Sequence, residues 1–532
     1  MCTTDVVVIG AGPTGLTLAN LLADWGIRVT VVEKRSSTGD EPRAISVTDE
    51  TLRVMAQIGI MDRLAPQMLL DTGARYFGRH DQLLAEVHPG TPVLGQPRKS
   101  QFDQPIMEQL LHHAARTRTN ITLRFSTEAL ALADHGESVT VAVADAAGPD
   151  TIQARWVVAC DGGRSPTRHH LRIALDGSTQ VEKWIVLDLL NDTHHEHFSE
   201  FHCDGKRPHV IVPVGGGRCR YEFMLLPGED ATAMTSRSAI AELLRPYRAV
   251  APAEIRRAAV YVAQQRVAQT YRRERILLAG DAAHLMPPFA GQGLNAGIRD
   301  AANLAWKLAT CIHGSGTSAL IDTYQRERRP HAVQMIKLSH RIGQIVMTTD
   351  SRITPIRDAA ITALSVLPTV KDWIVGMRFV RPPHLTQGCV VAASPALPTA
   401  AAALVGRSLP QPEVQTTDAT TTPLDKVLGT GWALITLGGH PPRHGTPPWP
   451  GLTPRQIFIH RGVGSAPSRA GVVSVVDSSG VFTELAAGTE SVMLLIRPDR
   501  YVAAAFRPQE AADVTAALAP YLAVPAGQPS VA

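Results

Sequence analysis

Hydrophobic residues run without alternation through two short segments near the start of the chain. Residues 5–10 (DVVVIG) and 28–33 (RVTVVE) are continuous apolar runs, and between them apolar residues recur at Leu18, Leu22 and Trp25. Unalternated runs are typical of strands that are buried on both faces of a parallel sheet. The pattern therefore predicts a strand, a helix and a second strand, joined by a right-handed crossover.

The pattern changes between residues 174 and 272, where short strands dominate. Residues 209–214 and 220–226 flank the glycine triplet 215–217, which predicts a hairpin. A buried strand returns at 275–281 (RILLAGD), followed by the three- and four-residue apolar spacing of long helices within 292–347. We therefore expect a sheet inserted into an α/β fold.

Composition shifts again beyond residue 381. Residues 381–424 are rich in Pro, Ala and Thr, which predicts an irregular linker. Strand patterns resume at 432–439, 472–477 and 491–506, and a helical pattern closes the chain at 508–522. These elements predict a separate C-terminal α/β domain.

Composition and charge exclude several classes of protein. The 532 residues are 44% hydrophobic and 19% charged, as expected of a chain that buries large cores. Lys and Arg number 52 against 48 Asp and Glu, without a basic stripe, so nucleic acid is not an expected partner. Six scattered cysteines without a CxxC pair indicate reduced thiols. With no recognisable signal peptide or membrane span, these features predict a cytoplasmic protein without a bound metal.

The first chemical motif is Gly10-x-Gly12-x-x-Gly15, between a predicted strand and a predicted helix. Gly10 permits a tight turn, Gly12 lets the backbone approach a pyrophosphate, and Gly15 lets the helix pack on the strand. The helix start adds unpaired N–H groups, and Glu33 can accept ribose hydroxyls from the end of the next strand. The motif predicts a dinucleotide site; the alternative is a tight turn that binds nothing.

A second motif, Asp161-Gly162-x-x-Ser165-x-x-Arg168, follows another predicted strand. Taken alone, the Asp-Gly pair is a turn. Arg168 is then explained equally well as a solvated helix cation.

A third motif begins with Gly-Asp at 280–281 and ends with Gly-Leu-Asn at 293–295, where a helix starts. The carboxylate can accept a ribitol hydroxyl, and the N–H groups can bind the carbonyl edge of a flat heterocycle. Taken alone, the segment is also compatible with a helix cap behind a loop stiffened by two prolines.

The order and separation of these three motifs resemble those of the FAD-dependent aromatic hydroxylases, single-component flavoprotein monooxygenases with the para-hydroxybenzoate hydroxylase fold. Residues 33–53 (EKRSSTGDEPRAISVTDETLR) and 277–309 (LLAGDAAHLMPPFAGQGLNAGIRDAANLAWKLA) are similar to the 3-(3-hydroxyphenyl)propionate hydroxylase branch. The resemblance covers residues 5–390 and weakens towards the C-terminus. There RPDRYVAA is similar to the thioredoxin-like domain appended to many relatives, but without CxxC we expect no redox activity.

The resemblance implies an α/β fold with a Rossmann-like FAD-binding domain, an interleaved β-sheet substrate domain and a C-terminal thioredoxin-like domain. The FAD-binding domain would comprise residues 1–173 and 273–390, with long helices at 292–347, and the substrate domain residues 174–272. A linker over 391–424 would lead to the C-terminal domain at 425–532.

The resemblance also implies roles for individual residues. Arg43 would lie near the pyrophosphate and the incoming nicotinamide, Gln104 near the ribityl–phosphate side, and Arg168 would order the Asp161 loop. The Pro288 carbonyl would lie beside the hydroxylation site. The residues with an implied cofactor-binding role are Gly10, Gly12, Gly15, Glu33, Arg43, Gln104, Asp161, Gly162, Arg168, Gly280, Asp281, Gly293, Leu294 and Asn295.

Family membership would mean FAD as cofactor, NADH or NADPH as electron donor and O₂ as co-substrate. A flavin C4a-hydroperoxide would then hydroxylate a phenolic substrate. No second glycine motif follows a strand, so the nicotinamide would bind transiently over the flavin. The partner would be a small aromatic molecule, and a homodimer stays open.

Candidate catalytic residues come from the middle strands. His209 could accept a phenolic proton near neutral pH, and Arg220 could pair with a substrate carboxylate; Tyr221 and Glu222 lie beside them. The ordinary alternatives are a surface histidine and a solvated arginine. His284 is expected to be structural. The segment with His194, His195, His197, His202 and Cys203 is expected to be a polar loop, not a metal site.

Three functions stay open at this point. The first is a phenol hydroxylase acting on a compound similar to 3-(3-hydroxyphenyl)propionate. The second is a monooxygenase that tailors a polycyclic aromatic natural product by hydroxylation, epoxidation or Baeyer–Villiger oxidation. The third is a non-catalytic escort protein with the FAD fold.

Overall fold

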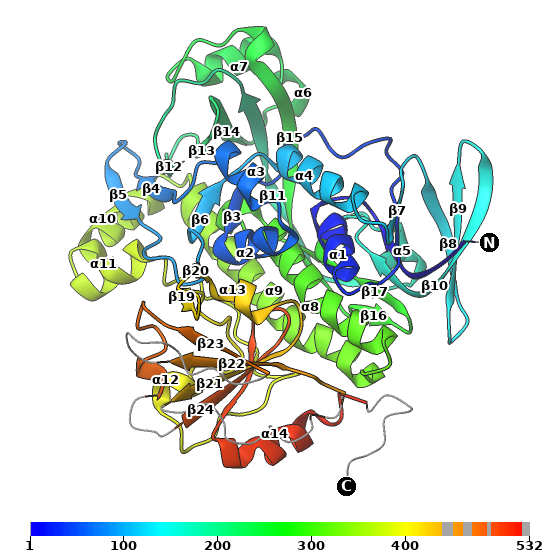
Figure 1. Ribbon diagram of the computed structural model, residues 1–532. Helices are drawn as coiled ribbons and strands as arrows, with labels where there is room; N and C mark the ends of the chain where they lie inside the picture. Colours follow the sequence, from blue (N-terminus) through cyan, green and yellow to red (C-terminus); the bar gives the residue numbers. More distant parts are fainter. Residues whose placement is uncertain (1, 439–448, 450, 461–470, 487–490, 524–532) are drawn as a thin grey trace.

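The structure, a computed structural model, describes residues 2–438, 449, 451–460, 471–486 and 491–523. Figure 1 shows two large sheets in the N-terminal three-quarters of the chain and a third sheet formed by the C-terminal part. Within the described residues no helix is long and apolar enough to cross a membrane.

The first sheet contains the predicted strand–helix–strand unit. Its strands run in the order β16-β17-β10-β1-β2-β7, and β1 is parallel to β2 and β10. Helices α1 and α8 pack against each other beside this sheet. The elements are β1 (Cys2–Ile9), α1 (Pro13–Ala23), β2 (Val29–Val32), α4 (Gln104–Arg116), β7 (Ile121–Arg124), β8 (Glu128–Asp134), β9 (Val139–Asp145), β10 (Gly148–Ala159), α5 (Pro166–His170), β16 (Arg272–Arg273), β17 (Ile276–Leu278) and α8 (Gly293–Ile312).

The second sheet has the order β18-β15-β11-β14-β13-β12-β4-β5, and the predicted hairpin is its antiparallel pair β13–β14. The sheet also takes in two strands from residues 73–87, ahead of the range expected for the substrate domain. Strand β4 pairs in parallel with β12, more than 100 positions further along the chain, and such non-local pairing leaves no local signal. The elements are β4 (Gly73–Phe77), β5 (Leu83–Val87), β11 (Leu175–Leu189), β12 (Phe198–His202), β13 (His209–Val214), β14 (Arg218–Leu225), α6 (Ala231–Met234), α7 (Arg237–Leu244), β15 (Ile255–Ala268) and β18 (His284–Leu285).

Smaller elements connect the two sheets. Strands β3 (Ser46–Thr48) and β6 (Lys99–Gln101) pair to form a two-stranded antiparallel ribbon. The long helix α9 (Ser318–Met347) runs beside α8 and continues towards the second sheet. Helices α10 and α11 lie against β5. The remaining helices here are α2 (Asp49–Ile58), α3 (Met61–Leu64), α10 (Ile353–Ser365) and α11 (Pro368–Val375).

The third sheet has the order β20-β19-β23-β22-β21-β24-β25, with a parallel centre and antiparallel β24 and β25. Two of its strands, β19 and β20, lie within residues 391–424, where we expected a linker. Both strands are short and mostly polar, and β20 lies at the sheet edge, so their sequence is typical of a loop. The elements are α12 (Thr399–Ala402), β19 (Glu413–Thr416), β20 (Thr421–Pro423), α13 (Leu424–Leu428), β21 (Ala433–Gly438), β22 (Arg455–His460), β23 (Val472–Val476), β24 (Ser491–Ile496), β25 (Val502–Phe506) and α14 (Ala511–Leu518).

Candidate functional site

A cavity of about 1660 Å³ extends from the first sheet to the second. Its walls include the loops of all three predicted motifs and the cavity-facing side chains of β4, β12, β13 and β14. Single ligand pockets occupy roughly 300–1,000 Å³, so this cavity has room for a nucleotide cofactor and a second ligand.

At the nucleotide end, each glycine of the first motif has a different steric reason. A Cβ on Gly15 would lie 2.0 Å from the Gly10 carbonyl oxygen, and one on Gly10, whose φ is +108°, would lie 2.4 Å from the Cys160 oxygen. A Cβ on Gly12 would meet no atom within 4 Å, because this residue faces the cavity at the start of α1. Two glycines thus permit the packing, and the third leaves space for a ligand at a helix N-terminus.

Glu33, at the end of β2, is held in the geometry that a ribose-binding carboxylate needs. One carboxylate oxygen accepts the Ala11 N–H at 2.8 Å, and the other accepts the Arg35 backbone and side-chain N–H groups at 3.0 Å. Burial would raise the pKa of Glu33, but the bonds from Arg35 and Ala11 hold it below its ordinary value. The group is therefore an ionised acceptor on the cavity wall.

The second motif forms a loop that Arg168 fastens to the third. Arg168 is 3% exposed and donates to the Gly163 and Ala282 carbonyl oxygens at 2.9 and 3.0 Å, so it is not a solvated cation. Asp161 accepts the Thr167 N–H with one oxygen, while its buried Oδ1 has no partner in the described residues. An unpartnered carboxylate oxygen beside the cavity indicates a hydrogen-bond donor on the ligand.

In the third motif, Asp281 faces the cavity directly while its neighbours are buried. Burial raises the pKa of Asp281, and His284 and Arg43 counteract this rise. A Cβ on Gly293, the first residue of α8, would meet no atom within 4 Å. Asn295 is fully buried, and its side chain fixes the loop by accepting from Thr48 and Thr51 and by donating to Ser46 and Gly291.

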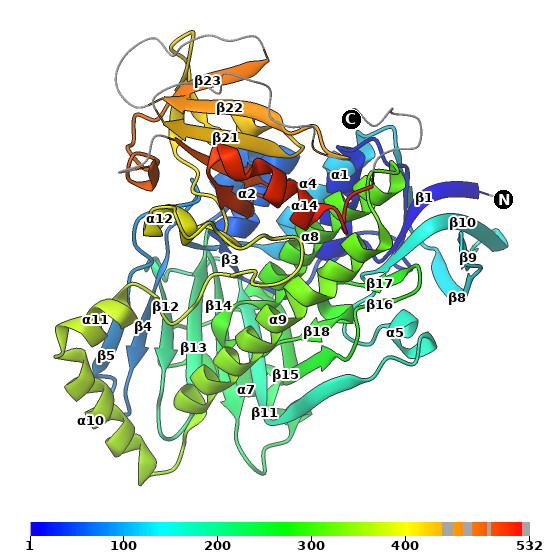
Figure 2. The ribbon, with the colours of Figure 1, turned by 90° about the horizontal axis from the view of Figure 1, so that it is seen from below.

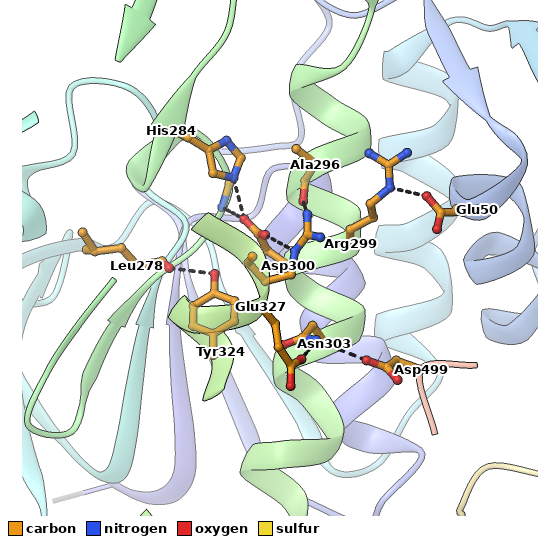
Figure 3. A network of polar contacts seen from close by, with 12 residues as sticks. Glu50, Leu278, His284, Ala296, Arg299, Asp300, Asn303, Tyr324, Glu327 and Asp499 are labelled. Carbon is orange, nitrogen blue, oxygen red and sulfur yellow. Dashed lines mark hydrogen bonds and ion pairs between the residues drawn. The ribbon is translucent and has the colours of Figure 1, made fainter. Parts of the chain in front are cut away.

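A buried polar network stands behind this loop (Figure 3). Asp300 of α8 accepts the Gly280 N–H, contacts the fully buried His284 at 2.6 Å and pairs with Arg328 of α9 at 2.9 Å. Burial would raise the pKa of Asp300, but His284 and Arg328 hold it below its ordinary value. The predicted structural role of His284 agrees with these contacts.

Helices α2, α8 and α9 carry two links to the C-terminal part of the chain. Glu50 accepts from Tyr501 at 2.9 Å, from Ser408 and from Arg299, and Arg299 also donates to Gln292 of the third-motif loop at 3.1 Å. A second link is a fully buried cluster around Glu327, which pairs with Lys307 and Arg497 at 2.7 and 2.8 Å. The loop at 291–295 is thus connected to the C-terminal part by side chains.

The other predicted cofactor residues also lie at the cavity. Arg43 is exposed to it, whereas Gln104 is buried, accepts the Ala44 N–H at 2.7 Å and donates to Glu108 at 2.6 Å. Pro288 faces the cavity, and its carbonyl accepts the Gly291 N–H at 2.8 Å. Phe289 seats this loop on Trp184 of β11.

These features fit FAD. Open space lies in front of Gly12, Gly162 and Gly293, one glycine from each motif, and Asp161 and Asp281 line the same cavity. Backbone N–H groups at two helix starts suit phosphate and the carbonyl edge of a flavin.

At the substrate end, apolar and aromatic side chains form one part of the wall. Val210 and Val212 of β13 face the cavity, and Tyr76 of β4 stacks on Phe201 of β12 with ring centroids 4.8 Å apart. Sequence reasoning missed the residues from β4, β6 and β12, including Lys99, because they belong to no motif and meet only through non-local pairing.

Arg220 of β14 lines the cavity, but its guanidinium is already bound. It donates to both oxygens of Asp188, at 2.6 and 3.2 Å, and to the Pro42 and Arg43 carbonyl oxygens. Because Asp188 occupies the bidentate position, the structure does not support the predicted clamp for a substrate carboxylate. At 3% exposure the solvated alternative fails too, and Arg220 instead holds the Arg43 loop.

His209 of β13 lies on the opposite face of the sheet from the cavity. It stacks on His202, and its two ring nitrogens contact the Tyr247 hydroxyl and the Arg207 carbonyl oxygen. Burial lowers the pKa of His209 to about 4. We therefore do not retain it as a phenol base. Tyr221 lies on this same face, whereas Glu222 faces the cavity, where burial raises its pKa against the opposing effect of Arg220.

Comparison with known proteins agrees with this site. A FAD binding domain model matches residues 3–339, and a HcaD C-terminal domain model matches residues 406–520. Over 526 residues the chain is 37% identical to a 3-(3-hydroxy-phenyl)propionate/3-hydroxycinnamic acid hydroxylase of Mycolicibacterium smegmatis, with 97% of this chain and 92% of the relative covered. It is 33% identical to the protein of that name from Comamonas testosteroni, with 98% and 97% covered.

Solved structures share the fold across nearly the whole chain. The flavin-dependent monooxygenase PieE, in complex with FAD and substrate, has a TM-score of 0.80 at 21% identity, with 97% of this chain and 98% of that one covered. Aklavinone-11 hydroxylase, in a ternary complex with FAD and aklavinone, has a TM-score of 0.74 at 23% identity, with 96% and 98% covered.

The paired sheets and the cavity between them define a flavoprotein monooxygenase. Within that class, the chain belongs to the family of FAD-dependent aromatic hydroxylases. The predicted fold class, cofactor and type of reaction are thereby confirmed.

Proposed function

We propose that this protein hydroxylates a phenol that carries a short carboxylate side chain, of the 3-(3-hydroxyphenyl)propionate type. The relatives with 33–37% identity over nearly the full chain have names that specify this compound and 3-hydroxycinnamic acid. The observation that carries the proposal is the single cavity that joins the nucleotide loops to an aromatic, apolar wall. A flat phenol fits against that wall.

The proposed binding roles follow the contacts of each motif. Gly10, Gly12, Gly15 and Glu33 hold the ADP half of FAD at the start of α1. Asp281 accepts a ribitol hydroxyl, and the first N–H groups of α8, from Gly293, Leu294 and Asn295, bind the carbonyl edge of the flavin. The remaining cavity residues of the nucleotide end are Arg43, Gln104, Asp161, Gly162 and Arg168, with Gly280 packed behind them on Thr14.

When bound, FAD takes electrons from NADH or NADPH and activates O₂ for transfer to the ring. The protein must orient the phenol and exclude water from it. Val210, Val212, Phe201 and Tyr76 supply an apolar wall for this purpose. Pro288 lines the same cavity, and its proposed role is to present its carbonyl beside the ring carbon that is hydroxylated.

The division into domains is also a proposal, adjusted to the sheets. We assign residues 73–87 to the substrate domain with 174–272, and begin the C-terminal domain near residue 406. A cytoplasmic location and a homodimer stay predictions.

The test is turnover by protein purified with FAD. We expect 3-(3-hydroxyphenyl)propionate to stimulate NADH or NADPH oxidation and to gain one oxygen atom, as measured by product mass. Stimulation only by multi-ring phenols would replace this proposal with the natural-product tailoring reaction. Protein that binds FAD but oxidises no NADH or NADPH with any phenol would favour the escort role.

A further inference from the structure

Lys307 is fully buried and Lys99 is half-buried, and these two lysines have opposite surroundings. Lys307 pairs with Glu327 at 2.7 Å. The Lys99 ammonium of β6 donates instead to two neutral acceptors, the Gly73 carbonyl at 2.9 Å and the Ser199 hydroxyl at 3.1 Å. Within the described residues no carboxylate lies within ion-pair distance of Lys99. Burial therefore lowers the pKa of Lys99, to about 8, without an opposing effect from a nearby negative charge.

Lys99 lies on the cavity wall, beside its apolar part. Ala74, Tyr76 and Phe201 line the same region. A half-buried cation beside apolar side chains is stabilised by an anion that lies next to it. At neutral pH a lysine with this pKa is mostly charged, so the surroundings favour an anionic ligand.

Two hydrogen-bond donors are left over at this position. An ammonium has three N–H groups, and Lys99 uses two of them. The Ser199 oxygen accepts from both Lys99 and Gln101, at 3.1 and 2.7 Å, which uses its two lone pairs and leaves its own O–H to donate. Ser199 is 2% exposed and lines the cavity.

A chain of side chains relates this pair of donors to the flavin loop. Gln101 accepts from Ser46 at 2.6 Å, and Ser46 is the residue that a Cβ on Gly291 would contact at 3.2 Å. Lys99 therefore belongs to the same wall as the loop but is separated from it by three side chains. A ring near Pro288 with an anionic tail pointing along this wall would bring the tail to Lys99.

We propose that Lys99, with the hydroxyl of Ser199, binds the carboxylate of the substrate side chain and makes the enzyme selective for acids. This assignment rests on the proposed function. It replaces Arg220, whose guanidinium is held by Asp188, as the group that recognises the carboxylate. Because the anion lies away from the reacting ring, Lys99 determines specificity and leaves the oxygen transfer unchanged.

The experiment compares an acid with its neutral isostere. The substrates are 3-(3-hydroxyphenyl)propionate and 3-(3-hydroxyphenyl)propionamide, and the proteins are the wild type, Lys99→Met, Lys99→Arg and Lys183→Met. Lys183 is an exposed lysine of the substrate sheet and controls for the loss of one positive charge. We expect Lys99→Met to raise KM for the acid by about 10- to 100-fold, the range for losing a charge-assisted hydrogen bond. KM for the amide and kcat for both should change by less than about threefold, and Lys99→Arg should recover part of the preference.

A binding measurement keeps the test independent of turnover. Titration with 3-phenylpropionate, followed by the flavin absorbance, should show the same loss of affinity in Lys99→Met while the FAD content stays that of the wild type. Equal losses for acid and amide would overturn the assignment and make Lys99 a structural part of the wall. If the wild type prefers the acid and Lys99→Met keeps that preference, the assignment alone is wrong. If the wild type accepts only uncharged multi-ring phenols, the proposed function is wrong as well.

Discussion

The two ends of the cavity bind their ligands by different means. At the nucleotide end, backbone atoms and glycines from three short loops face the ligand, and the side chains behind them are locked in hydrogen bonds. At the substrate end, side chains from β4, β6, β12, β13 and β14 form the wall, and apolar and polar groups both contribute to it. A cofactor common to a whole family is held by backbone geometry, whereas selectivity for one phenol rests on side chains that can change singly.

The largest effect should come from adding a methyl group at the nucleotide end. Gly15→Ala would place a Cβ 2.0 Å from the Gly10 oxygen, a backbone atom that cannot move aside. Overpacking usually costs about 1–3 kcal/mol, and a backbone clash exceeds that range, against a net stability of about 5–15 kcal/mol. We expect no folded flavoprotein, as checked by circular dichroism and FAD content.

The matched change is Gly12→Ala, where the same methyl group meets open space. Thermal unfolding of the apoprotein should stay within about 0.5 kcal/mol of the wild type. FAD affinity should fall by about tenfold, or about 1.4 kcal/mol, in a fluorescence titration. If both variants unfold alike, the distinction between packing and ligand-facing glycines is wrong.

Next in size is Arg220→Met at the substrate end. It would remove the bidentate partner of the buried Asp188, which then keeps the more distant Arg257 at 3.7 Å, and breaking such a pair costs up to about 3–5 kcal/mol. It would also remove the donor to the Arg43 carbonyl. Chemical denaturation measures the loss. The double variant Arg220→Met/Asp188→Leu should recover part of it, since the buried Asp188 carboxylate is then removed together with its bidentate partner. A stable single variant that has lost only affinity for the acid would restore Arg220 as the carboxylate clamp.

A smaller effect is expected for Tyr501→Phe, which removes a donor to Glu50. A hydrogen bond to a charged group contributes about 1.5–3 kcal/mol. Burial would raise the pKa of Glu50, but Arg299 and Tyr501 hold it below its ordinary 4.5, so this stabilisation is present above that pH and is lost as pH falls below it. The difference in melting temperature between wild type and variant should therefore shrink in acid. Tyr521→Phe, also in the C-terminal part, is the control.

The smallest effect should follow His209→Gln. The variant loses stacking on His202 and a contact with Tyr247, at about 1 kcal/mol of stability. Because His209 faces away from the cavity, kcat and its pH profile should stay within about twofold of the wild type. If a pKa seen in the pH profile of kcat for the wild type is missing in the variant, His209 would again be a candidate for the base that deprotonates the phenol.

The nucleotide end was the predictable one, because each of its motifs is contiguous and lies at the end of a strand. The roles expected for the three glycines agree with their different contacts, and Arg168 joins two motifs that the sequence keeps 114 positions apart. To predict which residues line the substrate end, one must know which face of each strand points into the cavity. In β13 all six residues are buried, so the apolar pattern on both faces hides whether His209 or Val210 points to the cavity.

The remaining features of the site and fold depend on pairing between strands that are far apart in the sequence, which the local sequence pattern does not indicate. Strands β4 and β12 meet across more than 100 residues, and only their pairing brings Lys99 to Ser199. In the same way, β19 and β20 are recognisable as strands only from their place beside β23. For Arg220 the sequence could not reveal Asp188, which lies opposite it on β11.

The chain of hydrogen bonds from Tyr501 through Glu50 and Arg299 to Gln292 matters for anyone who recombines these enzymes. A chimaera that exchanges the C-terminal part for that of another family member must supply a hydroxyl group at the position of the Tyr501 side chain. Without it, Glu50 and Arg299 would change their positions next to the loop at 291–295. Swapping this module would then alter how the prosthetic group is seated, because Ser408, which also donates to Glu50, and its neighbours Arg407 and Pro410 lie on the cavity wall.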